Sequence, residues 1–185
     1  MTHRLKPSVT VAAIIEQNGK FLLVEEHTPE GLMLNNPAGH LELGESLQEA
    51  CARETLEETA YTFTPKYLLG VYISRFKRNQ VKPLKPLSTI IPASSYTPAK
   101  DENIEDITYL RFAFCGTLGP FNSELKLDEG IVRTLWLDIN EIRGSSAVHR
   151  SPLLLACAED YMNGKRFDLN TLHTDPSIYT PPIRA

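Results

Sequence analysis

The sequence is poor in cysteine, and the three that it has are Cys51, Cys115 and Cys157. They lie far apart, are odd in number and lack the spacing of a zinc site. This pattern argues against a disulfide framework and a cysteine-bound metal. It predicts small buried thiols in a reducing compartment.

Long apolar runs are also absent. The longest purely apolar stretches include residues 11–15 and 153–157, whereas a membrane-spanning helix needs about 20 apolar residues. The basic residues near the N-terminus are not followed by the apolar segment of a secretory signal. We therefore expect a cytoplasmic protein without a membrane partner.

Positive charge is not in excess, because 19 Lys and Arg residues stand against 23 Asp and Glu, a net charge of −4 at pH 7. Composition thus gives no electrostatic reason to expect nucleic acid as a partner. An anionic small molecule would have to be held by local cations or by a metal ion. The length of 185 residues fits a single domain spanning 1–185, and the oligomeric state stays open.

Patterns of apolar and β-branched residues predict strands separated by turns and helices. An Asn18-Gly19 turn joins two strands whose apolar runs are continuous enough for burial on both faces. The expected strands are 8–16, 21–26, 67–76, 107–117 and 131–137, and the expected helices are 46–58, 138–142 and 151–164. This order predicts a mixed α+β architecture.

Three segments lack a regular pattern. We expect a loop at 27–36, and a long inserted loop at 77–106 that carries several prolines, basic residues and then acidic residues. We interpret this insertion either as a segment near the substrate or a subunit contact, or as a solvated loop. The proline-containing tail at 175–185 should be extended or frayed.

The most informative stretch is the helix that begins after Ser46. Leu47, Ala50 and Cys51 form an apolar stripe at i, i+3 and i+4, and the next members of that stripe are Glu54 and Glu58. Acidic side chains therefore occupy the face that should meet the core.

Glu57 adds a third carboxylate at the same helix end. A solvated acidic face is the ordinary explanation, but negative charge at a helix C-terminus costs about 0.3–1 kcal/mol per charge. Glu54 and Glu58 also repel each other at i,i+4. Because Mg²⁺ binds carboxylate oxygens together with substrate phosphates, the cluster predicts a metal site.

The residues around this helix agree with a strand, loop and helix in succession. Residues 35–39 and Gly44 carry loop signals. Ser46 with Glu49 three residues later has the form of a capping box.

These residues resemble the Nudix box of the Nudix hydrolases, G-x5-E-x7-R-E-U-x-E-E-x-G-U, in which U is aliphatic. The matching residues are Gly39, Glu45, Arg53, Glu54, Glu57 and Glu58. The departures, Thr55, Ala60 and Tyr61, remove no carboxylate. Ala60 should affect how the helix ends, because a left-handed residue with a Cβ is strained. Outside the box, residues 9–26, 35–50, 109–114 and 151–167 are similar to a bacterial phosphatase branch of the family.

The resemblance implies an α/β/α sandwich with a central mixed β-sheet. It implies Mg²⁺, with Mn²⁺ as an alternative, bound by the Gly39 carbonyl, Glu54, Glu57 and Glu58. The reaction expected is attack of water on a phosphorus of a phosphoanhydride. Glu45, Arg53, Glu54 and Glu57 are the expected catalytic group, in which Arg53 orients Glu45 or Glu57.

Some roles stay open. The general base is Glu54, Asp128 or Glu129. His40 contacts phosphate or caps the loop, and Arg111 pairs on the sheet face or binds an anionic ligand.

The substrates expected from the resemblance are nucleoside tri- or diphosphates or thiamine-type pyrophosphates, and the bond cleaved stays open. The alternatives are a pyrophosphohydrolase of nucleotide sugars or dinucleotides, a non-catalytic nucleotide-binding module, and an RNA-processing enzyme. An RNA-processing enzyme would need a basic surface to bind RNA, which the composition does not indicate.

Overall fold

A computed structural model describes residues 4–79 and 104–180. The strands are β1 Ser8–Ile14, β2 Glu16–Gln17, β3 Lys20–Thr28, β4 Gly31–Asn35, β5 Ala38–His40, β6 Tyr61–Asn79, β7 Ile104–Phe121, β8 Ile131–Asp138 and β9 Phe167–Asp168. The α-helices are α1 Leu47–Thr59, α2 Ile139–Gly144 and α3 Leu153–Met162, and short 3₁₀ helices cover Ser146–Val148, Leu169–Thr171 and Pro176–Tyr179.

The strands form two hydrogen-bonded sheets. The larger has the order β5-β1-β7-β6-β9, in which β1 and β7 are parallel and the other pairs antiparallel. The smaller has the order β2-β3-β4, with β8 paired to β3, and is antiparallel throughout. The mixed sheet is therefore present, although the strands divide between two sheets rather than one.

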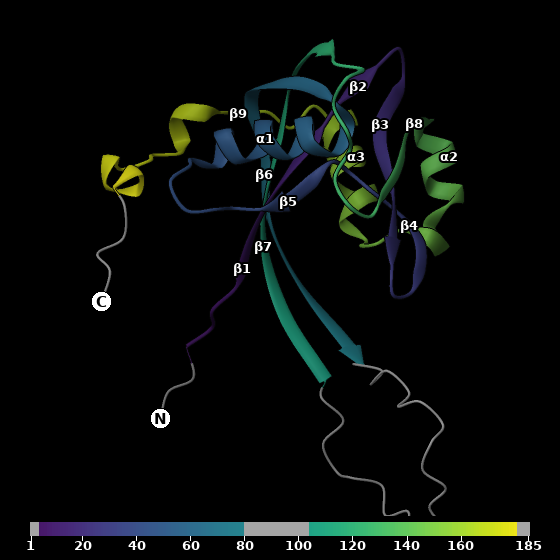
Figure 1. Cartoon of the computed structure of the whole chain (residues 1–185), viewed down its shortest axis with the longest axis horizontal. Coiled ribbons are helices and arrows are strands. Elements are labelled where there is room, and N and C mark those ends of the chain that lie inside the picture. Colours follow the sequence, from purple (N-terminus) through teal and green to yellow (C-terminus); the bar gives the residue numbers. More distant parts are fainter. Residues whose placement is uncertain (1–3, 80–103, 181–185) are drawn as a thin grey trace, which may run out of the picture.

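Burial along β1 explains the layers. Val11 and Ala13 point to one face and pack with Ala50 and Cys51 of α1. Ala12 and Ile14 point to the other face and join the cluster that contains the buried residues of α2 and α3. A strand buried on both faces needs cover on both sides, and Figure 1 shows the helices on opposite sides of the strands. The predicted α/β/α sandwich is confirmed.

The predictions for the cysteines and for the Asn18-Gly19 turn also hold. All three cysteines are buried and free. The Asn18-Gly19 turn connects β2 and β3, with both residues at positive φ. No helix of residues 4–79 and 104–180 is both long and apolar enough to cross a membrane.

Several boundaries differ from the sequence-based expectation. The loop expected at 27–36 contains β4, which forms because its backbone pairs with β3 from Val24 to Thr28. The strand expected to stop at Thr117 continues through Gly119-Pro120 to Phe121, paired with Tyr61 of β6.

The segment expected as a loop at 77–106 is strand at both of its ends. Residues 77–79 end β6 and residues 104–106 begin β7, and the two strands pair as a long antiparallel hairpin that extends away from the body (Figure 1). Residues 80–103 lie outside the described part of the chain. The tail at 175–185 is not wholly extended, because Pro176–Tyr179 forms a 3₁₀ helix and the Tyr179 hydroxyl donates to Glu49 Oε2 over 2.8 Å.

Candidate active site

The acidic helix α1 begins where the capping box predicts. The Ser46 hydroxyl accepts a hydrogen bond from the Glu49 N–H over 3.2 Å, and Glu49 Oε2 accepts from the Ser46 N–H over 2.7 Å. Two backbone N–H groups at the helix start are thereby satisfied. This cap fixes where the helix begins.

The helix ends at Ala60, which has φ 59° and ψ 12°. Its N–H still donates to the Leu56 carbonyl over 2.8 Å. A residue with a Cβ is strained in this left-handed region, so the departure from glycine at this position costs stability without changing how the helix ends.

Arg53 makes five hydrogen bonds, four of them to acidic side chains. Nε and Nη2 bind the two Glu45 carboxylate oxygens over 2.9 and 2.8 Å, a bidentate pair. Nη1 donates to Glu54 Oε1 over 2.9 Å and to Glu57 Oε2 over 2.8 Å. Nη2 also donates to the His40 carbonyl over 2.9 Å. One guanidinium thus ties the loop before α1, two carboxylates of α1 and strand β5 together.

The edge strand β5 is held against α1 by the same helix face. The Ala38 N–H donates to Glu58 Oε2 over 2.8 Å. At Gly39, an added Cβ would lie 2.0 Å from Cδ of Glu54. Only glycine therefore allows the Glu54 carboxylate to lie on the backbone of β5, which gives a physical reason for Gly39 in the motif.

The predicted cluster of the Glu54, Glu57 and Glu58 carboxylates is not formed in the structure. Within the described ranges, no three His, Cys, Asp or Glu side chains are grouped closely enough to hold a metal ion. Arg53 draws Glu54 and Glu57 to itself, while Glu58 turns to the Ala38 N–H. These contacts compete with metal ligation for the same oxygens.

The electrostatics of the carboxylates nevertheless fit a divalent cation. Burial raises the pKa of Glu58 to about 8, against the lowering effect of the Ala38 N–H, and burial also raises the pKa of Glu54. Glu58 is only 8% exposed. Buried carboxylates with raised pKa values are stabilised in the charged form by a nearby cation, and their oxygens are the ligands that Mg²⁺ prefers.

Glu45 is in the opposite situation. Its pKa is lowered by the Arg53 guanidinium, and Arg53 in turn has its pKa raised by Glu45. Both groups are charged, and their pairing serves to fix the loop on the helix.

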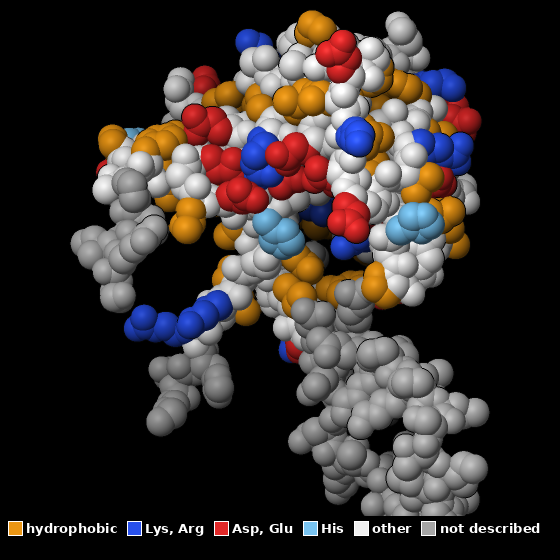
Figure 2. Space-filling view, in the orientation of Figure 1, with side chains coloured by type: hydrophobic (Ala, Val, Ile, Leu, Met, Phe, Trp, Pro, Cys, Tyr) orange, Lys and Arg blue, Asp and Glu red, His pale blue; other side chains and the backbone are white. Residues whose placement is uncertain are grey.

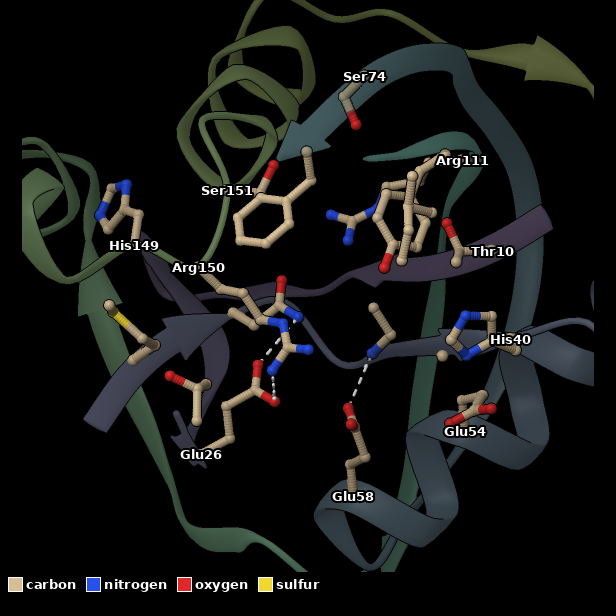
Figure 3. A pocket seen from close by; sticks show the side chains of 18 of the residues that line it. Thr10, Glu26, His40, Glu54, Glu58, Ser74, Arg111, His149, Arg150 and Ser151 are labelled. Carbon is tan, nitrogen blue, oxygen red and sulfur yellow. Dashed lines mark hydrogen bonds and ion pairs between the residues drawn. The ribbon is translucent and has the colours of Figure 1, made fainter. Parts of the chain in front are cut away.

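A pocket of about 450 Å³ lies beside these residues. Gly39, Glu54 and Glu58 line one wall, and Figure 2 shows acidic side chains gathered above a hollow on this face. The opposite wall comes from β6, β7 and the segment before α3, and includes Arg111 and Arg150. Figure 3 shows Arg111 across the pocket from Glu54 and Glu58, and Arg150 against Glu26.

The predicted substrate residues divide between this pocket and its surroundings. Arg111 and His40 line it. Asp128 is exposed and lies at the end of α1, where its N–H donates to the Glu57 carbonyl over 3.0 Å. Glu129 is exposed and does not line the pocket, and neither does Glu57.

Sequence reasoning missed Glu26 and Arg150. Glu26 lies two residues after the buried run of β3, and its carboxylate accepts from Arg150 Nη1 over 2.6 Å and from Asn35 Nδ2 over 3.3 Å. Burial raises the pKa of Glu26. No local signal in the sequence indicates this pair, because Arg150 lies 124 positions away.

Comparison with known proteins agrees with this geometry. A family model described as the NUDIX domain matches residues 4–156. Phosphatase NudJ of Escherichia coli strain K12 is 32% identical over 167 residues, which cover 90% of this chain and 91% of the relative.

Solved structures give the same result. A Nudix hydrolase from Nitrosomonas europaea is 45% identical with a TM-score of 0.72, covering 92% of this chain and 98% of that one. The MutT protein of Methanosarcina mazei Go1 shares the fold at 20% identity, with a TM-score of 0.58 and coverage of 89% and 100%. Together with the motif on α1, these matches show that the chain belongs to the Nudix hydrolase family.

Proposed function

We propose that this Nudix hydrolase cleaves phosphoanhydride bonds of nucleoside tri- or diphosphates, or of thiamine-type pyrophosphates, with Mg²⁺ as the metal and Mn²⁺ as a substitute. The observation that carries the proposal is the position of buried carboxylates on one wall of a pocket whose other wall presents guanidinium groups. Such a pocket suits a metal-bound diphosphate. A relative named as a phosphatase supports hydrolysis of a phosphate-containing compound.

Glu57 and Glu58, with the Gly39 carbonyl, would hold the metal, and Glu54 would join them where Asp128 is the base. When bound, the metal polarises phosphoryl oxygens, neutralises their charge and lowers the pKa of water. Arg53 holds Glu45, Glu54 and Glu57 at fixed positions, so it acts as a positioning residue.

Glu54 is the residue that we assign as general base. It lines the pocket, and burial raises its pKa toward the working range of a base. Asp128 is the alternative, since it lies near enough to act electrostatically on both Glu54 and Glu58. His40 and Arg111, which line the pocket, contact the substrate in this proposal, whereas Asp128 and Glu129 are assigned to the substrate from their sequence position alone.

The deciding experiment measures phosphate and pyrophosphate release from nucleotides, nucleotide sugars, dinucleotides and thiamine diphosphate, with Mg²⁺, with Mn²⁺ and with chelator. We expect metal-dependent phosphate release from the tri- or diphosphates. Release of two monophosphates from nucleotide sugars or dinucleotides instead would support the pyrophosphohydrolase alternative. Absence of turnover on every substrate, despite Mg²⁺ binding, would support a nucleotide-binding module.

The metal assignment is tested by Glu57→Gln, which keeps the side chain's size but removes its charge. We expect at least a 100-fold loss of kcat with the fold retained, because a carboxylate ligand is lost and a source of repulsion at the helix end is removed. Glu159→Gln is the matched control, because Glu159 pairs only with Arg143 on the surface, over 3.0 Å, in the described contacts. Full activity of the Glu57 variant would refute the metal assignment.

A further inference from the structure

The pocket wall on β6 and β7 is a ladder of paired residues. Arg111 pairs with Tyr72 and Tyr109 pairs with Ser74, two residues further toward the hairpin end. Ile107 pairs with Phe76 two residues beyond. Because alternate residues share one face of a strand, Arg111, Tyr109 and Ile107 all face the pocket that they line. At about 3.3 Å per residue, this wall is roughly 13 Å long.

The inner end of the wall is polar and lacks partners. Arg111 Nε and Nη1 are both shut off from solvent and make no hydrogen bond. Thr10 Oγ1, on the strand residue that pairs with Arg111, is buried and unbonded as well. These are three of the six such side-chain atoms in the described residues. Buried polar groups in proteins are normally bonded, so their grouping at one point indicates a missing ligand.

The charge around Arg111 identifies the ligand as an anion. Burial lowers the pKa of Arg111 and repulsion from Arg150 lowers it further, whereas Cys157 and the nearby carboxylates of Glu58 and Glu26 act to raise it. Arg150 is neutralised by Glu26 Oε2 at 2.6 Å, whereas no carboxylate of the described residues binds the Arg111 guanidinium. The N–H groups on Nε and Nη1 lie in one plane and can donate to two oxygens of a phosphate.

Beyond Arg111 the pocket is closed. The next residue on this face of β7 is Ala113, which is fully buried, and Cys157 of α3 lies over the same region with no exposure. At the other end Phe76 is 39% exposed, and the rings of His40 and Tyr109 lie 6.3 Å apart. The polar end is therefore a dead end, and the aromatic end is the mouth.

The metal carboxylates lie within reach of this dead end. Thr10 pairs with Arg111 of β7 on one side and with His40 of β5 on the other. Since neighbouring strands are about 4.8 Å apart, the backbones of β5 and β7 are roughly 10 Å apart. One diphosphate group, together with the arginine side chain, can span that distance.

We infer that Arg111 and Thr10 form a closed subsite for an unesterified terminal phosphate, so that the enzyme selects substrates whose diphosphate chain ends free. A terminal phosphate that carries a sugar or a second nucleoside would need room beyond Arg111, where Ala113 and Cys157 fill the space. The organic group of the substrate then lies at the mouth, against Phe76, Ile107 and Tyr109. This inference rests on the proposed function and specifies its substrate class.

The test compares ADP with ADP-ribose, which differ in whether the terminal phosphate is esterified. We expect the wild-type kcat/KM to be at least 10-fold higher for ADP. Arg111→Gln should lower kcat/KM for ADP by roughly 10- to 100-fold, mainly through KM, since it removes charge-assisted hydrogen bonds to phosphate. The same variant should change the value for ADP-ribose by less than about threefold.

Two further variants keep the test decisive. Arg111→Lys retains the positive charge but cannot donate two parallel hydrogen bonds. It should keep more of the preference for ADP than Arg111→Gln does. Thr10→Val removes one hydroxyl at nearly constant volume and should weaken ADP alone by roughly three- to tenfold, which covers the case in which Arg111→Gln does not fold. The matched control is Arg133→Gln, an exposed arginine of β8 that pairs with Glu25 and does not line the pocket.

An equal loss on both substrates in Arg111→Gln, or a wild-type preference for ADP-ribose, would overturn the inference. Failure of the proposed function is a separate outcome, because neither substrate would then be hydrolysed by the wild type. In that case calorimetric binding of ADP and ADP-ribose with Mg²⁺ still decides the point. Weaker ADP binding by Arg111→Gln, with ADP-ribose binding unchanged, would support the subsite, whereas unchanged ADP binding would refute it.

Discussion

Replacing Arg53 by alanine removes the one cation that joins Glu45, Glu54, Glu57 and the His40 carbonyl. Hydrogen bonds to charged groups contribute about 1.5–3 kcal/mol each, but the five contacts share one side chain and are not additive. The Arg53 side chain is 25% exposed, and those of Glu45 and Glu54 are 14% and 12% exposed. A partly buried network of this kind should cost about 3 kcal/mol of unfolding free energy when its cation is lost.

The measurement is urea unfolding of the wild type, Arg53→Ala and Arg53→Lys in chelator, so that metal binding does not contribute. Lysine keeps the charge but cannot make the bidentate pair with Glu45, so we expect it to recover no more than about half of the loss. Turnover of both variants should fall, because the carboxylates are no longer held in position.

A double-mutant cycle with Glu45→Gln isolates the bidentate pair, whose coupling should be about 1–3 kcal/mol. Two results would contradict the role of Arg53 in positioning the carboxylates. These are a loss of less than about 1 kcal/mol of unfolding free energy in Arg53→Ala, or no coupling in the double-mutant cycle.

Two further predictions concern neighbouring residues. Gly39→Ala should lower kcat by at least 10-fold and the unfolding free energy by about 1–3 kcal/mol, because the added Cβ would lie 2.0 Å from Glu54 Cδ. Steady-state kinetics and thermal melting measure the two effects. A fully active variant would contradict the packing argument. In the metal-free protein, burial raises the pKa of Glu58 from 4.5 to about 8. Between these pH values the folded state therefore binds more protons than the unfolded state. The free energy of unfolding should fall as the pH rises from about 4.5 to 8. Glu58→Gln should flatten this pH dependence and be the more stable protein at pH 8.5 in chelator, as measured by urea unfolding; an unchanged slope would show that Glu58 does not titrate in this range.

Local signals in the sequence were sufficient to predict α1, its cap and its acidic face. The capping box at Ser46 and Glu49, the stripe that turns acidic, and the fixed spacing of Arg53 depend only on residues within a few turns of one helix. The Arg53 contacts with Glu45 and Glu57 follow from spacings of eight and four residues. Continuous apolar runs likewise predicted that β1 and β3 are buried on both faces.

The errors have physical causes outside those local signals. The strand β4 exists because β3 offers it a backbone to pair with, which no periodicity within 31–35 reveals. The long β6–β7 hairpin continues through residues 77–79 and 104–106 for the same reason. Near the C-terminus, the Tyr179 hydroxyl reaches Glu49 across 130 positions of sequence.

The pocket itself was decided by tertiary structure alone. Only the parallel pairing of β1 with β7 places Thr10 beside Arg111, and only the β1–β5 register brings both within reach of Glu54 and Glu58. The sequence could present Arg111 as either a paired or a ligand-binding arginine. Only the tertiary structure shows that its Nε and Nη1 are buried without a hydrogen-bond partner, which is the observation from which we infer that Arg111 binds a ligand. Sequence by itself therefore determined the family and the acidic helix, whereas the tertiary structure decided what faces that helix across the pocket.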